Sequence, residues 1–345
     1  MNDRVDRLRA GLDEPLLVSA AANVRYLTGF SSSNAALLVE PERLRLFSDF
    51  RYASAARALE GVEFSQVNRN LYASLAEELD GRIGFEATAV TYAEYETLTA
   101  GGLELVPRRD LVEALRAVKD ESELEAIRAA AAITSEAYER FSQERFTGRT
   151  ERELAWRLDE LFHELGAKAP AFETIVAGGP NAALPHSRPT DREIQPGETV
   201  VVDAGALVDR YCADCTRTFA TGPLPEQLEG AYAVCLEGQQ AGLEDARAGT
   251  TGIDADAAAR TVIDDAGFGE LFGHGLGHGV GIEVHEAPRL SRESRDTLAT
   301  GNVVTVEPGI YFPDEGGIRI EDLVVVTEDG PEILTSFTKE LVTVD

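Results

Sequence analysis

Four carboxylates lie in or directly beside apolar runs that are typical of buried β-strands. Asp203 ends the run TVVVD, and Asp214 lies in the following segment, CADCTRTF. Glu307 ends the run VVTVE, and Glu321 lies in GIRIEDLVVVT. An unpaired buried charge is very costly, so four of them require cations or shared protons. The fold must therefore bring these four side chains to one compensated site.

Two predicted hairpins would arrange the carboxylates in pairs. The midpoint of Asp203 and Asp214 falls between residues 208 and 209, so a hairpin centred there sets them directly opposite each other. Opposed residues on antiparallel strands have Cβ atoms about 4.5–5.5 Å apart. Glu307 and Glu321 flank the turn-rich segment PDEGG, which predicts a second hairpin, and Arg319 is expected on the same strand face as Glu321. Taken alone, either aspartate also fits an ordinary alternative, a strand-end residue that caps a turn.

Histidines gather in the same half of the chain. His274, His278 and His285 lie in the segment FGHGLGHGVGIEVHEAP, and His186 lies in NAALPHSRPT. The glycines fit no G-x-G-x-x-G register, and each would weaken a helix by about 1 kcal/mol, so we expect neither a dinucleotide loop nor a helical zinc pair. A loop or extended segment is expected instead. His163, on a predicted helix, is interpreted as a partly exposed helix residue.

The charges predict two divalent metal ions per chain. Four carboxylates and two divalent cations sum to zero, and one neutral imidazole completes the ligand shell. Oxygen-rich ligation without thiolate favours Mn²⁺, with Co²⁺ or Zn²⁺ as alternatives. Two metals about 3.5–4 Å apart would generate a bridging hydroxide nucleophile at neutral pH.

The order of predicted elements divides the chain into two domains. Residues 1–117 predict an α/β domain, with strands at 16–19, 35–39, 44–47, 82–85 and 103–106 and helices at 51–59 and 70–79. A long helix with Asp120 as N-cap and Glu123 at the N3 position opens the second domain, 118–345. A helix from Thr150 and helices at 227–244 and 254–266 accompany a strand-rich region that starts at 198. This second domain is predicted to be α+β, with helices covering one face of a curved antiparallel sheet.

These segments resemble the pita-bread metallopeptidases, specifically their proline-specific branch, Xaa-Pro dipeptidase (prolidase) and aminopeptidase P. The matching segments are VDAGALVDRYCADCTRTF, HGLGHGVGIEVHEAP, VTVEPGIYF and GIRIEDLVVVT, in the family's order. The segments NVRYLTGFSSSNAALLV and FSDFRYASAA resemble the creatinase-type N-terminal domain, and LRAVKDESELEAIRAA resembles the start of the catalytic domain. The resemblance implies an α+β pita-bread catalytic domain preceded by an α/β creatinase-type N-terminal domain.

The resemblance also implies a set of metal ligands. Asp203 would hold one metal through both oxygens, and Asp214 and Glu321 would bridge the two metals. His278 and Glu307 would complete the other metal's shell. No ligand position departs from the family's pattern.

Further residues receive implied roles in catalysis. Glu307 would shuttle the proton of the attacking water, and His285 would steady the tetrahedral intermediate. His186 and His274 would line the substrate pocket. Arg319 would balance the bridging hydroxide or orient the neighbouring glutamate ligand.

The implied reaction is metal-dependent hydrolysis of the Xaa-Pro bond at the N-terminus of dipeptides or short peptides. Xaa-Pro dipeptidase and aminopeptidase P share this motif set, so both remain open. One alternative is a metal-dependent hydrolase of a non-peptide amide or cyclic amidine, such as an osmolyte, because the same fold supports other reactions. Another is a peptide-binding relative without catalysis, which would bind less than one metal per chain.

Charge and composition limit partners and location. The net charge of −29 comes from 61 Asp and Glu against 32 Lys and Arg, which excludes nucleic acid and disfavours an acidic membrane surface. Such acidity is typical of a halophilic source. With three cysteines, no apolar signal segment and no long apolar run, we expect a cytoplasmic protein. The resemblance implies a homodimer.

Three other residue types receive structural interpretations. Cys212 and Cys215 lie on opposite faces of a predicted strand and are interpreted as small strand fillers, not as a redox or zinc motif. Trp156 is expected in the core. Thr216 shares the strand face of Asp214 and is expected to donate a hydrogen bond to it.

Overall fold

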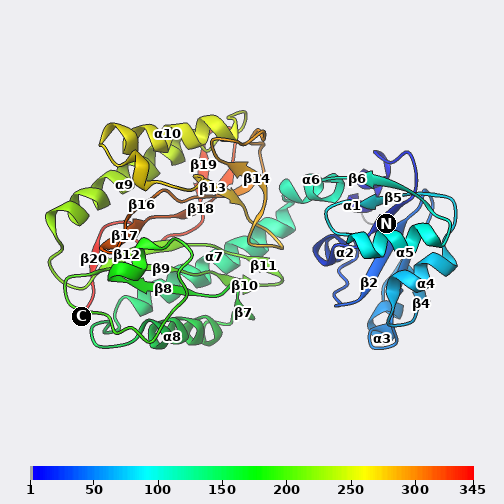
Figure 1. Cartoon of the computed structure of the whole chain (residues 1–345), viewed down its shortest axis with the longest axis horizontal. Helices are drawn as coiled ribbons and strands as arrows, with labels where there is room; N and C mark the ends of the chain where they lie inside the picture. Colours follow the sequence, from blue (N-terminus) through cyan, green and yellow to red (C-terminus); the bar gives the residue numbers. More distant parts are fainter. Residues whose placement is uncertain (1–2) are drawn as a thin grey trace. The chain divides into compact units, whose positions relative to one another are not determined.

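The computed structural model describes residues 3–345, and internal contacts divide the chain into two compact units, Met1–Arg116 and Ala117–Asp345. Met1 and Asn2, with which the predicted N-terminal domain begins, lie outside the described residues. The elements of each unit are labelled in Figure 1.

The first unit alternates strands and helices. Its elements are α1 (Asp3–Arg9), β1 (Leu16–Val18), α2 (Ala21–Thr28), β2 (Ala35–Val39), β3 (Leu44–Ser48), α3 (Ala53–Arg57), β4 (Glu63–Gln66), α4 (Leu71–Glu78), β5 (Arg82–Glu86), α5 (Tyr92–Ala100), β6 (Glu104–Arg108) and α6 (Leu111–Ala117), whose last residue begins the second unit. The strands form one mixed sheet in the order β4-β3-β2-β1-β5-β6. Leu17, Phe47 and Leu75 are fully buried in its core. The predicted α/β class is confirmed, and every predicted strand and helix of this unit is present within a few residues.

Helices α2 and α5 are among the elements of this unit that were not predicted; the others are α1, α6 and the strand β4. In α5 only Leu98 is buried, so apolar residues do not recur at helical spacing. Its start does carry a sequence signal, because Thr91 and Glu94 form a capping box. Helix α2 begins without a side-chain cap. Both helices depend on the tertiary setting more than on a local pattern.

The second unit contains four long helices and several short sheets. Its elements are α7 (Glu121–Phe141), α8 (Glu151–Glu164), β7 (Ala169–Pro170), β8 (Ile175–Gly178), the 3-10 helix η1 (Gly179–Ala183), β9 (Thr199–Asp203), β10 (Ala206–Val208), β11 (Tyr211–Cys212), β12 (Thr216–Ala220), α9 (Glu226–Asp245), α10 (Gly252–Asp265), η2 (Gly269–Leu271), β13 (Gly277–Gly279), β14 (Glu286–Leu290), β15 (Val303–Val306), β16 (Gly309–Phe312), β17 (Gly316–Arg319), β18 (Asp322–Val326), β19 (Pro331–Ile333) and β20 (Val342–Thr343). The predicted N-caps Asp120 and Thr150 both form capping boxes, with Glu123 and Glu153.

Two sheets carry most of the second unit. One has the order β20-β12-β9-β8 and the other β14-β13-β15-β18-β19, with the β16–β17 hairpin as a separate pair. Pairing is antiparallel except between β12 and β20. In Figure 1, α9 and α10 lie along one side of these strands, and α7 and α8 lie along the other. Apolar side chains of these helices pack on the sheets and leave a polar cavity between the strands.

The first predicted hairpin forms with a different register. Thr216 pairs with Asp203, and Val208 pairs with Tyr211, so the turn is centred between Asp209 and Arg210. Both turn residues have positive φ, at 46° and 77°, as a two-residue type I′ turn requires. The prediction that Asp203 lies directly opposite Asp214 is therefore wrong. The shift is by two residues along one strand, so both carboxylates still share one face.

The second predicted hairpin is confirmed. Val306 pairs with Asp322 and Gly309 pairs with Arg319, and this common register sets Glu307 opposite Glu321. Ile318 and Ile320 face an apolar cluster, whereas Arg319 and Glu321 face the cavity. The alternation expected of a strand therefore holds through the break between β17 and β18.

Three structural interpretations have mixed outcomes. Cys212 and Cys215 are buried and free of disulfides, as expected. His163 is exposed on α8, also as expected. Trp156 is not in the core: it is 68% exposed on α8, and its indole N–H donates to Glu160. No helix among the described residues is long and apolar enough to cross a membrane.

Candidate metal centre and active site

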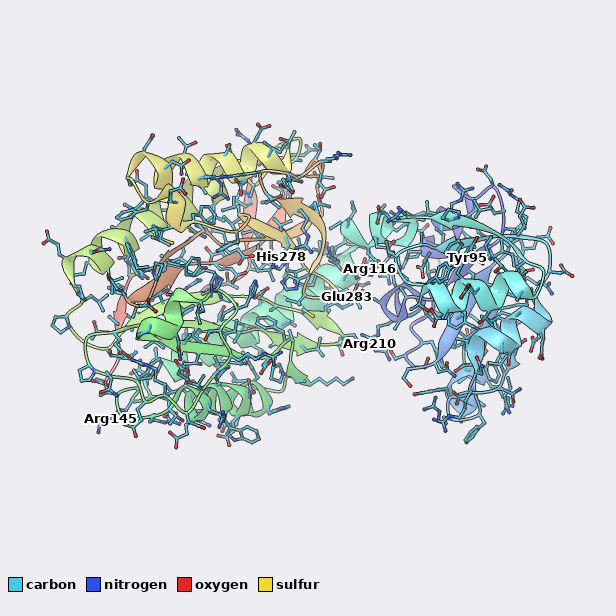
Figure 2. The ribbon with its side chains drawn as sticks, viewed as in Figure 1. Tyr95, Arg116, Arg145, Arg210, His278 and Glu283 are labelled. Atoms are coloured by element: carbon cyan, nitrogen blue, oxygen red, sulfur yellow. The ribbon has the colours of Figure 1, made fainter. Side chains whose placement is uncertain are left out.

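All nine predicted site residues line one cavity of about 410 Å³ in the second unit. They come from different sequence segments and meet in or next to the strands β9, β12, β13, β15 and β17 and in the loops between elements. Figure 2 shows His278 in the interior of this unit. The nine residues are His186, Asp203, Asp214, His274, His278, His285, Glu307, Arg319 and Glu321.

Three carboxylates form the core of the site. One oxygen from each of Asp203, Asp214 and Glu321 lies within 4.8 Å of the others. Asp203 closes β9 between Ile175 of β8 and Thr216 of β12. Asp214 lies on the irregular segment between β11 and β12, and Glu321 lies between β17 and β18. All three residues thus lie at or near a strand end, and their side chains line the cavity.

Burial, and after it repulsion between neighbouring carboxylates, raises the proton affinity of these groups. Burial raises the pKa of Asp214 and Glu321 well above the usual range, and neighbouring carboxylates raise it further. Burial also raises the pKa of Asp203, although the positive charge of Arg319 opposes the shift. Without added positive charge the cluster would therefore retain protons.

Two oxygens of the cluster also need a partner. Asp203 Oδ1 and Glu321 Oε1 are buried, and among residues 3–345 no donor reaches either atom. A buried polar atom without a partner is unusual and calls for an explanation such as an ion. Hard oxygen donors in a group of excess negative charge fit divalent cations. The residues present therefore fit a metal centre.

His278 has the ring orientation of a metal ligand. Its Nδ1 lies 3.1 Å from the carbonyl oxygen of Gly279, which can only accept, so Nδ1 carries a proton. Its Nε2 lies 3.7 Å from Asp214 Oδ2 and 3.2 Å from Glu307 Oε1. A neutral ring directs the lone pair of Nε2 to these carboxylates, which is the tautomer that metal coordination needs.

Glu307 differs from the other three carboxylates. Burial raises its pKa, but the hydrogen bond and charge interaction with His278, together with the charge interactions with His274 and Arg319, outweigh burial and lower the pKa to about 2. Thr305 donates a hydrogen bond of 3.0 Å to Glu307 Oε1 and accepts one from the backbone N–H of His278. Glu307 is thus held ionised beside the carboxylate cluster.

Arg319 and Thr216 connect the carboxylates of Asp203 and Glu321 through hydrogen bonds. Arg319 is buried, and its Nη2 lies 2.7 Å from Asp203 Oδ2. Thr216 accepts a hydrogen bond from Arg319 Nε at 3.1 Å and donates one of 2.7 Å to Glu321 Oε2. The expectation that Thr216 donates to Asp214 is wrong, because the register shift sets Thr216 beside Asp203, within reach of Glu321.

Tyr311 was not predicted and links two predicted residues. Its hydroxyl accepts a hydrogen bond from Arg319 Nη1 at 3.1 Å and lies 2.9 Å from His274 Nε2. His274 Nδ1 lies 2.8 Å from the carbonyl of Gly275, so its Nε2 accepts from Tyr311 when the ring is neutral. The sequence indicated only that Tyr311 would lie on the predicted second hairpin, between Glu307 and Glu321.

The remaining histidines lie at the mouth of the cavity. His285 is exposed at the edge of the cavity, and its ring centroid lies 4.3 Å from that of His278. Partial desolvation at the cavity wall and the neighbouring His278 lower the pKa of His285 to about 4. His186 is exposed at the rim. A neutral His285 can donate or accept a hydrogen bond to a molecule in the cavity.

Comparison with known proteins gives the family. Residues 125–328 match the model of metallopeptidase family M24, and residues 4–118 match the creatinase/prolidase N-terminal domain. The chain belongs to metallopeptidase family M24. The predicted pita-bread catalytic fold with a creatinase-type N-terminal domain is confirmed, as is the prediction of a metallopeptidase.

Relatives of this M24 chain match along its whole length. It is 35% identical to the Xaa-Pro dipeptidase of Pyrococcus furiosus, over 99% of this chain and 100% of the relative. The solved Xaa-Pro dipeptidase from Bacillus anthracis is 36% identical with a TM-score of 0.94, over 99% of both chains. The solved X-Pro aminopeptidase from Thermotoga maritima is 35% identical with a TM-score of 0.88, over 99% of this chain and 100% of that one.

Proposed function

We propose that this protein hydrolyses the bond before proline in Xaa-Pro dipeptides with the help of two divalent cations. The observation that carries the proposal is the buried carboxylate cluster with two unpartnered oxygens, in a chain whose full-length relatives include Xaa-Pro dipeptidases. A family M24 fold around such a cluster supports metal-dependent peptide hydrolysis over a binding role.

Five residues would hold the cations. They are Asp203, Asp214, His278, Glu307 and Glu321, whose carboxylate oxygens and imidazole nitrogen are suitable donors for divalent cations. The donor set, four carboxylates and one imidazole, supports Mn²⁺, with Co²⁺ or Zn²⁺ as alternatives. Bound divalent cations polarise a substrate carbonyl and lower the pKa of water.

The chain's own residues would manage the proton transfers. Glu307, held ionised, would take the proton of the attacking water and deliver it to the leaving nitrogen. This delivery matters because the prolyl nitrogen has no hydrogen and must leave as an amine. His285, neutral near pH 7, would donate a hydrogen bond to the developing oxyanion. His186 and His274 would line the substrate pocket.

Arg319 would keep the ligands in position during this chemistry. It pairs with Asp203, reaches Glu321 through the Thr216 hydroxyl, and reaches His274 through Tyr311. A guanidinium stays charged at every working pH and has several donors in one plane. Its position supports a role in orienting carboxylates and not in proton transfer.

The decisive experiment measures the hydrolysis of three peptides, first by metal-stripped protein and then by the same protein reloaded with Mn²⁺. Cleavage of an Xaa-Pro dipeptide that requires metal, with no cleavage of a matched Xaa-Ala dipeptide, is the expected result. Metal analysis of the same samples should give two cations per chain. Absence of cleavage of any peptide despite bound metal would overturn the peptidase proposal and direct the search to non-peptide amides.

An Xaa-Pro aminopeptidase is the second candidate, because the X-Pro aminopeptidase from Thermotoga maritima also matches the whole chain. An Xaa-Pro-Xaa tripeptide in the same assay separates the two. A dipeptidase is expected to prefer the dipeptide, and an aminopeptidase is expected to prefer the tripeptide.

Three properties from the sequence also remain proposals. A homodimer would sediment near twice the chain mass of 37.2 kDa. A cytoplasmic location is testable by fractionation of the source cells. A halophilic source agrees with the net charge of −29 and would show as optimal activity in concentrated salt.

A further inference from the structure

Glu151 is a buried carboxylate outside the metal centre. It is the first residue of α8 and is fully buried, yet the described residues contain no ion pair with it. It does not line the active-site cavity. A buried charge without a cation is costly unless hydrogen bonds compensate it, so its contacts show what it stabilises.

Every hydrogen bond to this carboxylate comes from one loop. Oε1 accepts from the backbone N–H of Gly178 at 2.9 Å and from Asn181 Nδ2 at 2.9 Å. Oε2 accepts from Asn181 Nδ2 at 3.0 Å, and from the N–H and hydroxyl of Thr190 at 3.0 and 2.6 Å. Glu151 thus binds both ends of the segment 178–190 at one point.

That loop forms a wall of the active-site cavity. Pro185 and His186, near its centre, both line the cavity. The carbonyl of Pro185 accepts a hydrogen bond of 3.1 Å from Arg319 Nη1. At the start of the loop, η1 packs closely on β17, since a Cβ on Gly317 would lie 2.0 Å from the carbonyl oxygen of Ala182. His186 lies between the two ends of the loop that donate hydrogen bonds to Glu151, at Gly178 and at Thr190. A shift of either end would therefore be expected to move His186.

We infer that Glu151 is a positioning residue that fixes the 178–190 loop and thereby sets His186 against the substrate. Its position at the start of α8 also suits an acidic side chain, because helix N-termini favour negative charge. The kinetic part of this inference rests on the proposed function, whereas the effect on the loop does not.

The arrangement requires a carboxylate and not merely a side chain of this size. Its two oxygens receive five hydrogen bonds, and a carboxylate only accepts. In Glu151→Gln one carboxylate oxygen is replaced by an amide NH2 group, which only donates. At one end of the loop this NH2 group would face another donor, so the hydrogen bond there would be lost. The substitution therefore keeps the volume of the side chain and releases one end of the loop.

The test uses full-length, metal-loaded Glu151→Gln protein with two independent readouts. Amide hydrogen exchange in peptides from 179–190 should accelerate on the order of tenfold to hundredfold, as expected for loss of a hydrogen bond to a charged group. KM for an Xaa-Pro dipeptide should rise by a similar factor, with a smaller change in kcat and unchanged metal stoichiometry. Glu160→Gln, on the exposed face of the same helix, should change neither readout.

A double-mutant cycle with His186→Ala separates positioning from general destabilisation. If Glu151 acts through His186, the effects of the two substitutions on KM should be strongly non-additive. Additive effects, or wild-type exchange in the loop, would overturn the inference. If Glu151→Gln does not fold, Thr190→Val decides, because it removes only one hydroxyl donor and should accelerate exchange in the same peptides.

Failure of the proposed function gives a different pattern. In that case wild-type protein would not cleave Xaa-Pro dipeptides at all. Hydrogen exchange in 179–190 would still decide whether Glu151 fixes the loop.

Discussion

At the scale of single residues, the hydroxyl of Thr216 joins two charged groups of the candidate metal centre. It accepts from Arg319 and donates to Glu321, whose other oxygen lacks a partner among the described residues. A neutral side chain thereby aligns a carboxylate for a cation. Removal of a side chain that hydrogen-bonds a metal ligand typically lowers metal affinity by about 10–100-fold.

Thr216→Val is expected to weaken metal binding roughly 10–100-fold, because valine keeps the shape of threonine and removes the hydrogen bond to Glu321. Isothermal titration of the metal-stripped protein with Mn²⁺ measures this. Thr218→Val is the matched control: its hydroxyl also bonds to Arg319, but to the main chain. Equal affinity in both variants and the wild type would contradict the role of Thr216.

At the residue scale, the sequence predicted which polar side chains would meet in the fold. Carboxylates in apolar strands and histidines clustered in the same half of the chain are improbable without a function, and the four carboxylates and four histidines chosen on this basis line one cavity together with Arg319. Tyr311, Thr305 and Glu151 carry no such signal. A tyrosine or threonine in a strand is ordinary, and Glu151 resembles any first-turn acidic residue of a helix. Their importance depends on distances that only the folded chain defines.

At the scale of elements, the segment that joins β9 to β12 positions Asp203 and Asp214. Its register places Gly205 opposite Asp214, and a Cβ on Gly205 would lie 1.8 Å from the carbonyl oxygen of Ala213. Glycine is therefore required for the close approach of the two strands. The sequence predicted the shared face of the two aspartates but not the register, because the positive φ at Asp209 and Arg210 moved the turn by one residue.

Gly205→Ala should separate these strands and displace both aspartates. We expect loss of about 1–3 kcal/mol or more in stability, as for overpacked cores, together with weaker metal binding. The midpoint of urea unfolding and a metal titration measure the two effects. Gly230→Ala, in α9 with open space around it, should be neutral or stabilise by up to about 1 kcal/mol. Wild-type metal affinity in Gly205→Ala would show that the strands tolerate the methyl group.

The end of β3 contains a separate ionic contact in the first unit. Asp49 accepts hydrogen bonds from Arg51 and from Asn34, which precedes β2. The hydrogen bond with Arg51 is the main reason that the pKa of Asp49 lies well below its usual range. A folded-state pKa below the unfolded value of about 3.9 stabilises the fold above that pH, and the stabilisation is lost as pH falls.

Asp49→Asn should therefore lower the urea midpoint at pH 7, and its difference from the wild type should shrink as pH falls below about 4. Unfolding curves of both proteins from pH 7 to pH 3 measure the trend. Asp80→Asn, an exposed aspartate of the same unit, serves as control and should match the wild type throughout. A difference that grows on acidification would refute the assignment.

At the scale of the whole molecule, the net charge of −29 predicts repulsion between the exposed charges. The chain carries 61 acidic against 32 basic residues. Repulsion between exposed charges acts over a Debye length of about 30 Å at 0.01 M salt but only about 3 Å at 1 M. Folding brings these charges together, so the native state gains more from screening than the unfolded chain does.

The thermal midpoint should rise as NaCl increases from about 0.01 M to about 1 M, at constant metal concentration. Differential scanning calorimetry measures the change. KCl at the same ionic strength should act alike, because screening depends on ionic strength and not on the cation. A midpoint that falls with salt would show that attractive ion pairs, such as Arg128 with Glu332, outweigh the net repulsion.

The buried carboxylate cluster also links the lifetime of the chain to the metal supply. Cations that bind only the folded chain stabilise it by RT ln(1 + [L]/Kd), about 2.7 kcal/mol at a hundredfold excess over Kd. Proteases cleave mainly the transiently open chains, whose population falls by the same factor. Proteolysis should thus slow at least about a hundredfold when free Mn²⁺ exceeds its Kd a hundredfold, and equal rates with and without metal would refute this. In a cell, metal starvation would then reduce the abundance of this protein as well as its activity.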